Sequence, residues 1–156
     1  MLNKLKKLLQ STDKKEEPND DDLKLAAATL MFEVISSDGR VDQVELTYMG
    51  EILRREFKLG EEDLDELFKI AKDSSHNATS LQGFTRQICE NWGNSKRLKL
   101  LEYLWVLALA DERIDPHERH LVRKVAGLLY LNEGQIVQSR ESAKLQLGIK
   151  GLKQAE

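Results

Sequence analysis

The stretch Asp38-Gly39-Arg40-Val41-Asp42-Gln43-Val44-Glu45 decides the fold, because its pattern returns as Asp111-Glu112-Arg113-Ile114-Asp115-Pro116-His117-Glu118. Both copies read Asp-x-Arg-(Val/Ile)-Asp-x-x-Glu, at an offset of 73 residues (111 minus 38). The apolar flanks repeat too, and the matched pairs are Met31 with Leu104, Phe32 with Trp105, Val34 with Leu107 and Phe57 with Tyr130. Repetition of motif and flanks predicts two related helical hairpins, each turning on an acidic corner. We call residues 38–45 the first corner and residues 111–118 the second corner.

Apolar spacing predicts helices along most of the chain. Residues 23–37 and 96–110 are apolar on nearly every side, so each is expected to form a buried helix ahead of a corner. Amphipathic patterns predict five more helices: one beginning at residue 42 and ended by Gly60, one from residue 61, one from about residue 80, one after residue 115 and one capped by Asn132. Ser95 is the expected N-cap of the helix at 96.

No stretch of the sequence shows the sustained period-two alternation of a β-strand. We therefore expect an all-α fold, a compact bundle of about seven helices built from two related helical hairpins. The expected organisation is a basic amphipathic helix and acidic linker at 1–22, a helical domain at 23–147 and a tail at 148–156, with fraying from residue 144 onward.

Composition excludes several classes of function. With 24 basic and 27 acidic side chains the formal charge is −3, so the chain has no overall positive field for nucleic acid. The single Cys89, among apolar neighbours, is expected to pack in the core, and one cysteine without a secretion signal favours a reducing, cytoplasmic setting. The most apolar segment, residues 98–110, contains Lys99 and Glu102 and is shorter than the roughly 20 apolar residues of a bilayer span. We expect no transmembrane helix.

The first 15 residues combine leucines at helical spacing with surrounding lysines. The leucines are Leu2, Leu5, Leu8 and Leu9, and the lysines are Lys4, Lys6, Lys7, Lys14 and Lys15. This pattern is typical of a helix that touches a membrane surface or a protein partner. The other interpretation is a helix that frays or packs on the domain, because isolated helices of this length are marginal in water.

The corners have a structural interpretation. Asp-x-x-Glu ahead of an apolar run is a capping box, in which the Asp42 side chain would accept from the Glu45 N–H and the Glu45 carboxylate from the Asp42 N–H. Pro116 at the first position of the second helix fits the same interpretation. Capping leaves Asp38 and Asp111 without a role, unless Arg40 and Arg113 pair with them.

The functional interpretation is a divalent cation. The candidate ligands are Asp38, Asp42 and Glu45 in the first corner and Asp111, Asp115 and Glu118 in the second, and such oxygen clusters suit calcium, magnesium or manganese. A complete EF-hand loop is not expected, because its earlier ligand positions would fall on Val34 and Ser36, and on Leu107 and Leu109. A cation shared between the corners would instead require the fold to bring them together.

Other chemistry is weakly indicated. His117 and His120 lie three residues apart and would share a helix face, which is compatible with a transition metal, whereas His76 falls in an expected loop without a partner. We find no phosphate-binding glycine loop, no His-Glu-x-x-His and no Ser/His/Asp or Cys/His arrangement. We therefore expect no enzyme, no catalytic residue and no organic cofactor.

The two hairpins, with Asp-Gly-Arg-Val-Asp-x-x-Glu in one and Asp-x-Arg-Ile-Asp-x-x-Glu in the other, resemble the TerB-like tellurite-resistance family over about Leu23 to Leu147. The chain is also similar to the TerB-like domain that accompanies a J-domain in membrane-anchored co-chaperones, although it has no His-Pro-Asp motif of a J-domain. The resemblance implies a bundle of about seven helices, two acidic clusters suspected of binding metal, and a role in stress response or as an interaction module.

The expected function is therefore a non-enzymatic cytoplasmic module of a tellurite, metal or envelope stress response, whose corners bind a divalent cation or a basic partner. The alternative is a structural adaptor for a protein or a membrane surface, in which the corners only cap helices. A protein partner is expected in either case, with peripheral contact at the inner membrane surface through residues 1–15 as a further possibility.

Overall fold

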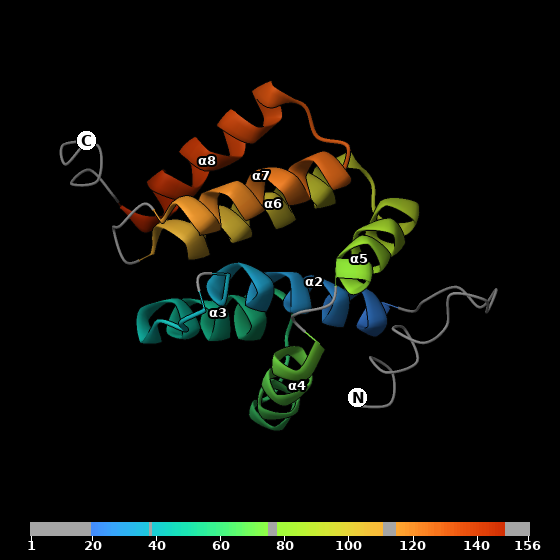
Figure 1. Cartoon of the computed structure of the whole chain (residues 1–156), viewed down its shortest axis with the longest axis vertical. Helices are drawn as coiled ribbons and strands as arrows, with labels where there is room; N and C mark the ends of the chain where they lie inside the picture. Colours follow the sequence, from blue (N-terminus) through green and yellow to red (C-terminus); the bar gives the residue numbers. More distant parts are fainter. Residues whose placement is uncertain (1–19, 38, 75–77, 111–114, 149–156) are drawn as a thin grey trace.

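The computed structural model describes residues 20–37, 39–74, 78–110 and 115–148. These residues form seven helices and no strand (Figure 1): α2 (Asp20–Ile35), α3 (Gln43–Glu56), α4 (Glu61–Ser74), α5 (Ala78–Asn91), α6 (Asn94–Leu109), α7 (Pro116–Leu128) and α8 (Glu133–Leu147). The predicted all-α class is confirmed. The internal repeat remains a prediction, and the expected helix at residues 1–15 lies outside the described residues.

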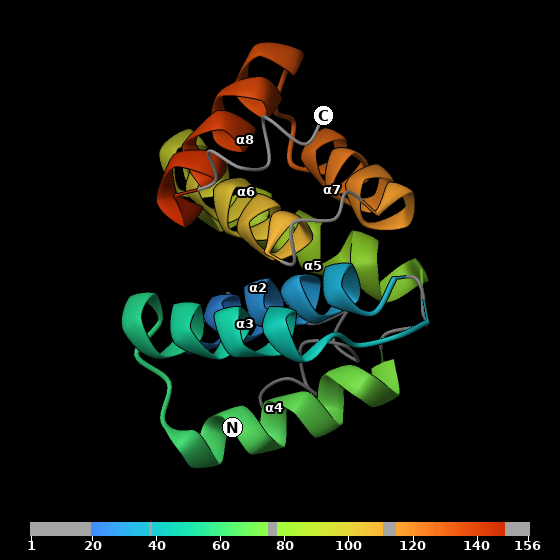
Figure 2. The ribbon, with the colours of Figure 1, turned by 90° about the vertical axis from the view of Figure 1, so that its left-hand side faces the viewer.

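Two helices form the centre of the bundle. α2 and α6 are the most apolar segments, and their side chains Ala27, Leu30, Leu104 and Trp105 are fully enclosed. α2 contacts α3, α4, α5, α6 and α7, while α6 also packs against α8. Figure 2 shows α6, α7 and α8 on one side of α2, with α3 beside α2 and α4 farthest from α8. The other helices therefore pack around α2 and α6 because this arrangement buries apolar surface on all sides of the two helices.

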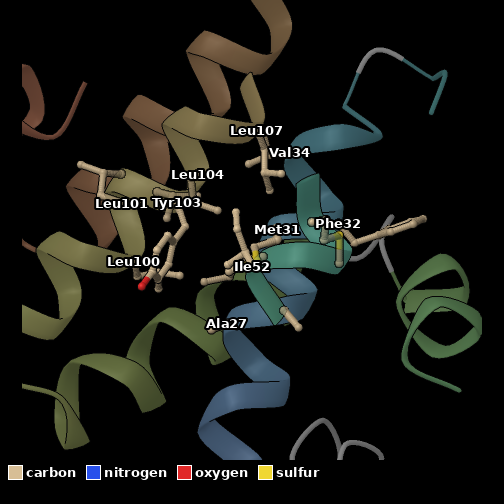
Figure 3. Close-up of a cluster of buried hydrophobic side chains, with 14 of the residues drawn as sticks. Ala27, Met31, Phe32, Val34, Ile52, Leu100, Leu101, Tyr103, Leu104 and Leu107 are labelled. Atoms are coloured by element: carbon tan, nitrogen blue, oxygen red, sulfur yellow. The ribbon is translucent and has the colours of Figure 1, made fainter. Parts of the chain in front are cut away.

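The C-terminal ends of α2 and α6 lie near each other in both ribbon views (Figures 1 and 2). Val34 and Leu107, close to those ends, are fully buried and belong to the same cluster of side chains (Figure 3). Because each corner follows the end of one of these helices, the fold puts the start of α3 and the start of α7 on the same side of the molecule.

Two helix starts differ from the sequence prediction. α2 begins at Asp20, so residues 20–22 belong to the helix and not to the expected acidic linker; acidic residues are favourable in the first turn of a helix. α6 begins at Asn94 with an extended Gly93 as its N-cap, not at Lys96 behind Ser95. α5 ends at Asn91, so only Trp92 and Gly93 separate the two helices.

Gly60 does not end α3. The helix ends at Phe57, whose N–H donates to Leu53 O at 3.2 Å, and Lys58 takes the left-handed conformation at φ +57°. α7 ends in the same way, with buried Leu129 followed by the left-handed and exposed Tyr130. Phe57 and Leu129 thus hold the same place after α3 and α7, 72 residues apart (129 minus 57), whereas the sequence comparison had matched Phe57 with Tyr130.

The last helix is longer than expected. α8 is capped by the reciprocal pair Asn132 and Gln135, which confirms the predicted cap. It continues to Leu147 and ends at Gly148, whose φ of +64° suits glycine. Residues 144–147 are thus helical and not frayed, while residues 149–156 lie outside the described part of the chain. Among the described helices none has the length and hydropathy that crossing a membrane requires.

Candidate functional site

The second aspartate of each corner caps a helix. The Oδ1 atom of Asp42 accepts from the Val44 N–H at 2.8 Å, and that of Asp115 accepts from the His117 N–H at 2.7 Å and the Glu118 N–H at 3.3 Å. Capping by both aspartates is confirmed, and it satisfies N–H groups that a helix start leaves without an internal partner. One detail differs, because the Asp42 side chain bonds the Val44 N–H instead of the expected Glu45 N–H.

The glutamate of each corner is buried. Glu45 is 1 % exposed and Glu118 is 4 % exposed, although both lie in the first turn of an amphipathic helix. One carboxylate oxygen of each is fully shielded from solvent. Burial of a carboxylate is costly unless a cation, hydrogen bonds or protonation compensate its charge. Matching burial at 45 and 118 was not expected, although helical spacing carried a signal for it: Met49 and Ile52 follow Glu45 by four and seven residues. Val122 and Val125 follow Glu118 at the same two spacings.

Part of the proposed metal site lies outside the described residues. Asp38 in the first corner and residues 111–114 in the second, which include Asp111 and Arg113, belong to this part. The expected pairing of Arg40 with Asp38 therefore stays a prediction. A complete EF-hand loop does not fit the structure, because Val34, Leu107 and Leu109 would occupy its earlier ligand positions and are buried apolar side chains.

The described residues contain no group of three or more His, Cys, Asp or Glu side chains arranged to hold a metal ion. Asp42, Glu45, Asp115 and Glu118 thus make no such group by themselves, and a cation site would need Asp38 or Asp111. His117 and His120 are both exposed at the start of α7, where His117 Nδ1 lies 3.5 Å from Asp115 Oδ1. They form no three-ligand group with other described residues, and His76 is outside the described residues.

A half-buried acid precedes the first corner. Burial raises the pKa of the Glu33 carboxyl in α2 to about 7. The sequence contained a signal for this residue, since Glu33 interrupts a segment that is otherwise apolar nearly all round. Its carboxyl therefore changes charge near neutral pH, unlike an ordinary surface glutamate.

A groove of about 640 Å³ opens beside the first corner, between α2, α3 and α4. Gly39 and Val41 from the corner line one part of it. The remaining lining residues are Phe32 and Ser36 of α2, Gln43, Leu46, Thr47, Gly50 and Arg54 of α3, and Glu61, Leu64, Asp65 and Phe68 of α4. Sequence analysis did not predict this groove, because it arises from the packing of three helices.

A smaller cavity of about 220 Å³ lies near the start of α6. Its charged groups meet neighbouring side chains: Lys96 Nζ and Lys99 Nζ each lie 5.5 Å from the ring centroid of Trp92 and Tyr103 respectively. Tyr103 Oη donates to Glu56 Oε1 at 3.0 Å, and this hydrogen bond is the main cause that lowers the pKa of Glu56. These contacts join α3, α6 and Trp92, which follows α5, so we interpret the cavity as structural.

Cys89 packs partly buried against the core, as expected. Its Sγ donates to Leu128 O at 3.4 Å, which ties α5 to the last residue of α7. Burial raises the pKa of the thiol. A raised pKa lowers the thiolate fraction, and the thiolate is the nucleophilic form. The contact therefore favours a packing role for this side chain.

Comparison with known families identifies one match. A family model described as "Tellurite resistance protein TerB" matches residues 24–141, which is more than half of the chain. This range begins in α2 and ends in α8, so it includes both corners and the groove. A search among curated proteins and a search among solved structures found no match.

Proposed function

The chain belongs to the tellurite resistance protein TerB family, and from that premise we propose that it is a non-enzymatic cytoplasmic binding module of a tellurite, metal or envelope stress response. In this proposal the acidic corners bind a divalent cation of the calcium, magnesium or manganese type. The ligands are Asp38, Asp42 and Glu45 in the first corner and Asp111, Asp115 and Glu118 in the second.

The observation that carries the proposal is the burial of Glu45 and Glu118 at matching places in the two corners. Each buried glutamate lies one turn after a capping aspartate, so each corner brings two carboxylates to one helix start. Carboxylate oxygens are the ligands that hard divalent cations prefer, so these donors fit the ion. The common side on which α3 and α7 begin supports either two neighbouring sites or one shared site (Figures 1 and 2).

The two aspartates of each corner have different tasks in this proposal. Asp42 and Asp115 hold the first turns of α3 and α7 in place through their Oδ1 atoms, which positions Glu45 and Glu118 one turn later. Asp38 and Asp111 have no capping task predicted, so they are the residues to substitute first. Loss of one carboxylate ligand is expected to weaken binding about tenfold or more, comparable to the 10–100-fold loss known for supporting groups of metal sites.

The test is a titration of the full chain with calcium, magnesium, manganese and zinc, followed by calorimetry and by NMR of the backbone amides. We expect saturable shifts at the amides of Gly39 and Glu118 with one of the first three ions, weakened in Asp38→Asn and Asp111→Asn. Glu62→Gln, an exposed acid in the first turn of α4, serves as the matched control and should bind as the wild type does. Absence of any saturable shift up to millimolar metal would exclude the cation proposal.

A second candidate function is a structural adaptor in which the corners only cap helices. The groove beside α3 favours it, because an apolar groove with polar edges is suited to binding a polypeptide. Co-sedimentation with anionic liposomes tests its membrane form. Leu5→Glu combined with Leu8→Glu should abolish sedimentation if residues 1–15 are the anchor, and equal sedimentation of variant and wild type would rule that anchor out.

A further inference from the structure

The groove between α2, α3 and α4 is lined by one face of α3 and by aromatic side chains of α2 and α4. Its α3 wall consists of Gln43, Leu46, Thr47, Gly50 and Arg54, whose spacings of 3, 1, 3 and 4 place them on one helix face. Phe32 and Phe68, with ring centroids 6.3 Å apart, contribute aromatic surface from α2 and α4. Gly50 lies at the middle of this wall, where the Arg54 guanidinium covers the position that a Cβ would take, with Nη1 at 3.5 Å. We propose that residues 1–15 of the same chain dock in this groove.

The apolar residues of the segment fit the length of the groove. Leu2, Leu5, Leu8 and Leu9 have the spacing of one helix face, and as a helix they span about 10 Å. The α3 wall from Leu46 to Arg54 extends about 12 Å by the same rise of ~1.5 Å per residue. A short amphipathic helix with anchors at such spacings is a recurrent ligand of apolar grooves.

Charge favours this occupant over a neutral or acidic one. Glu61 and Asp65 line the α4 edge of the groove, next to the exposed Glu62 and Glu66. The basic residue in the lining, Arg54, bonds Glu61 at 2.9 Å. Residues 1–15 carry five lysines, namely Lys4, Lys6, Lys7, Lys14 and Lys15, and one acid, Asp13. Their positive charge complements the acidic edge, which steers binding and orients the segment.

The covalent connection strengthens a contact that would be weak between separate molecules. Only residues 16–19 separate the segment from α2, and α2 itself lines the groove through Phe32 and Ser36. A short linker corresponds to an effective concentration in the millimolar range. Docking would stabilise a helix that is too short to be stable in isolation, and it would withhold its leucines from a membrane surface. The inference does not depend on cation binding at the corners.

The test compares backbone amide spectra of full-length variants. Leu5→Glu combined with Leu8→Glu should displace the segment and shift the amides of Thr47, Gly50 and Asp65, which line the groove. The matched control is Leu145→Glu, because Leu145 on α8 is already 80 % exposed; it should leave the groove amides in place. A substitution in the groove, Thr47→Arg at an exposed position, should in turn increase the fast motion of the Leu5 amide in ¹⁵N relaxation.

Three results would overturn the proposal. The first is groove amides that stay unchanged in the double leucine variant. The second is a wild-type spectrum whose groove shifts depend on protein concentration, since that would place the segment in the groove of a second copy. The third is a Leu5 amide that moves fast in the wild type and becomes ordered only when anionic vesicles are added, since that would assign the segment to a membrane.

Discussion

At the residue scale, each corner divides its acids between two environments. Asp42 and Asp115 are at helix starts, where their side chains accept backbone N–H groups. Glu45 and Glu118, three residues later, are buried in the first turns of α3 and α7. The capping aspartates therefore stabilise local structure, while the buried glutamates lie where water screens their charge interactions less. Capping and cation binding are thus compatible within one octet.

Substituting the N-cap aspartates tests whether they stabilise the starts of α3 and α7. Asp42→Ala and Asp115→Ala should each lower the free energy of unfolding by about 1 kcal/mol, because the first N–H groups of α3 and α7 lose their acceptor. Urea denaturation followed by circular dichroism measures the change. Asp42→Asn is the matched control, since asparagine caps about as well as aspartate while removing the charge. An equal loss in the alanine and asparagine variants would show that charge, and not capping, is what Asp42 contributes.

Glu33 is expected to make stability depend on pH. Its folded pKa of about 7 lies above the ordinary value of 4.5, so between these values the folded protein binds more protons than the unfolded chain. Stability contributed by this proton is present below pH 4.5 and is lost as the pH rises toward 7. Glu33→Gln should therefore be more stable than the wild type at pH 8, with the difference vanishing at pH 4.5.

Urea denaturation at pH 4.5 and pH 8 measures the effect of Glu33→Gln. Glu66→Gln, an exposed substitution of the same kind on α4, controls for the general loss of one negative charge. If the two variants respond alike to pH, burial of Glu33 is not the cause of the dependence.

At the element scale, helix ends follow backbone geometry more than the choice of capping residue. α3 ends through Lys58 and α7 through Tyr130, both in the left-handed conformation that non-glycine residues seldom adopt. In each case the next residue, Leu59 or Leu131, is buried. Burial of that leucine fixes where the chain must turn, so the turn occurs without a glycine. Prediction from the nearest glycine, Gly60, therefore misplaces the end of α3.

Replacing Gly83, a glycine inside a helix, is expected to stabilise the protein. Gly83 lies within α5, and a Cβ built on it has no heavy atom within 4 Å. Gly83→Ala should raise the free energy of unfolding by about 0.5 to 1 kcal/mol, because alanine restricts the unfolded chain and favours helix. Gly148→Ala is the opposite control, since its φ of +64° makes a side chain costly. Thermal unfolding should move up for the first variant and down for the second, and a decrease for both would refute this explanation.

At the scale of the whole molecule, α2 and α6 form the centre of the core. Each helix is apolar on nearly all sides, so exposing either one to water would be unfavourable. Their contact brings the hairpin α2–α3 against the hairpin α6–α7. The same contact places the starts of α3 and α7 on one side (Figure 2). Packing between distant segments thus determines both the core and the arrangement of the corners.

Truncating a buried side chain in the interface between α2 and α6 should destabilise the protein strongly. Leu104 is fully buried within the cluster of Figure 3, so Leu104→Ala should lower the free energy of unfolding by about 2 to 5 kcal/mol through lost burial and a residual cavity. Leu145→Ala, at a leucine that is 80 % exposed, should change it by less than about 0.5 kcal/mol. Equal effects of the two truncations in urea denaturation would mean that the α2–α6 contact does not carry the stability.

Several features of the protein were determined by the sequence alone. Local periodicity predicted the all-α class, most of the helices and the buried character of α2 and α6, because 3.6-residue spacing is a property of neighbouring residues. Short-range chemistry likewise predicted the caps at Asp42, Asp115 and Asn132. The octet repeat pointed to the TerB family, which the match over residues 24–141 confirmed.

Tertiary structure decided the rest. The burial of Glu45 and Glu118, the raised pKa of Glu33 and the groove beside α3 depend on which helices cover a given residue. Those helices are distant in sequence, and no local pattern specifies their contacts. The physical reason is that desolvation and cavity shape are properties of packed neighbours, whereas helix propensity and capping involve residues within one turn. The sequence therefore showed the repeated acids and the helix face on which each glutamate lies, whereas packing decided how completely that face is covered.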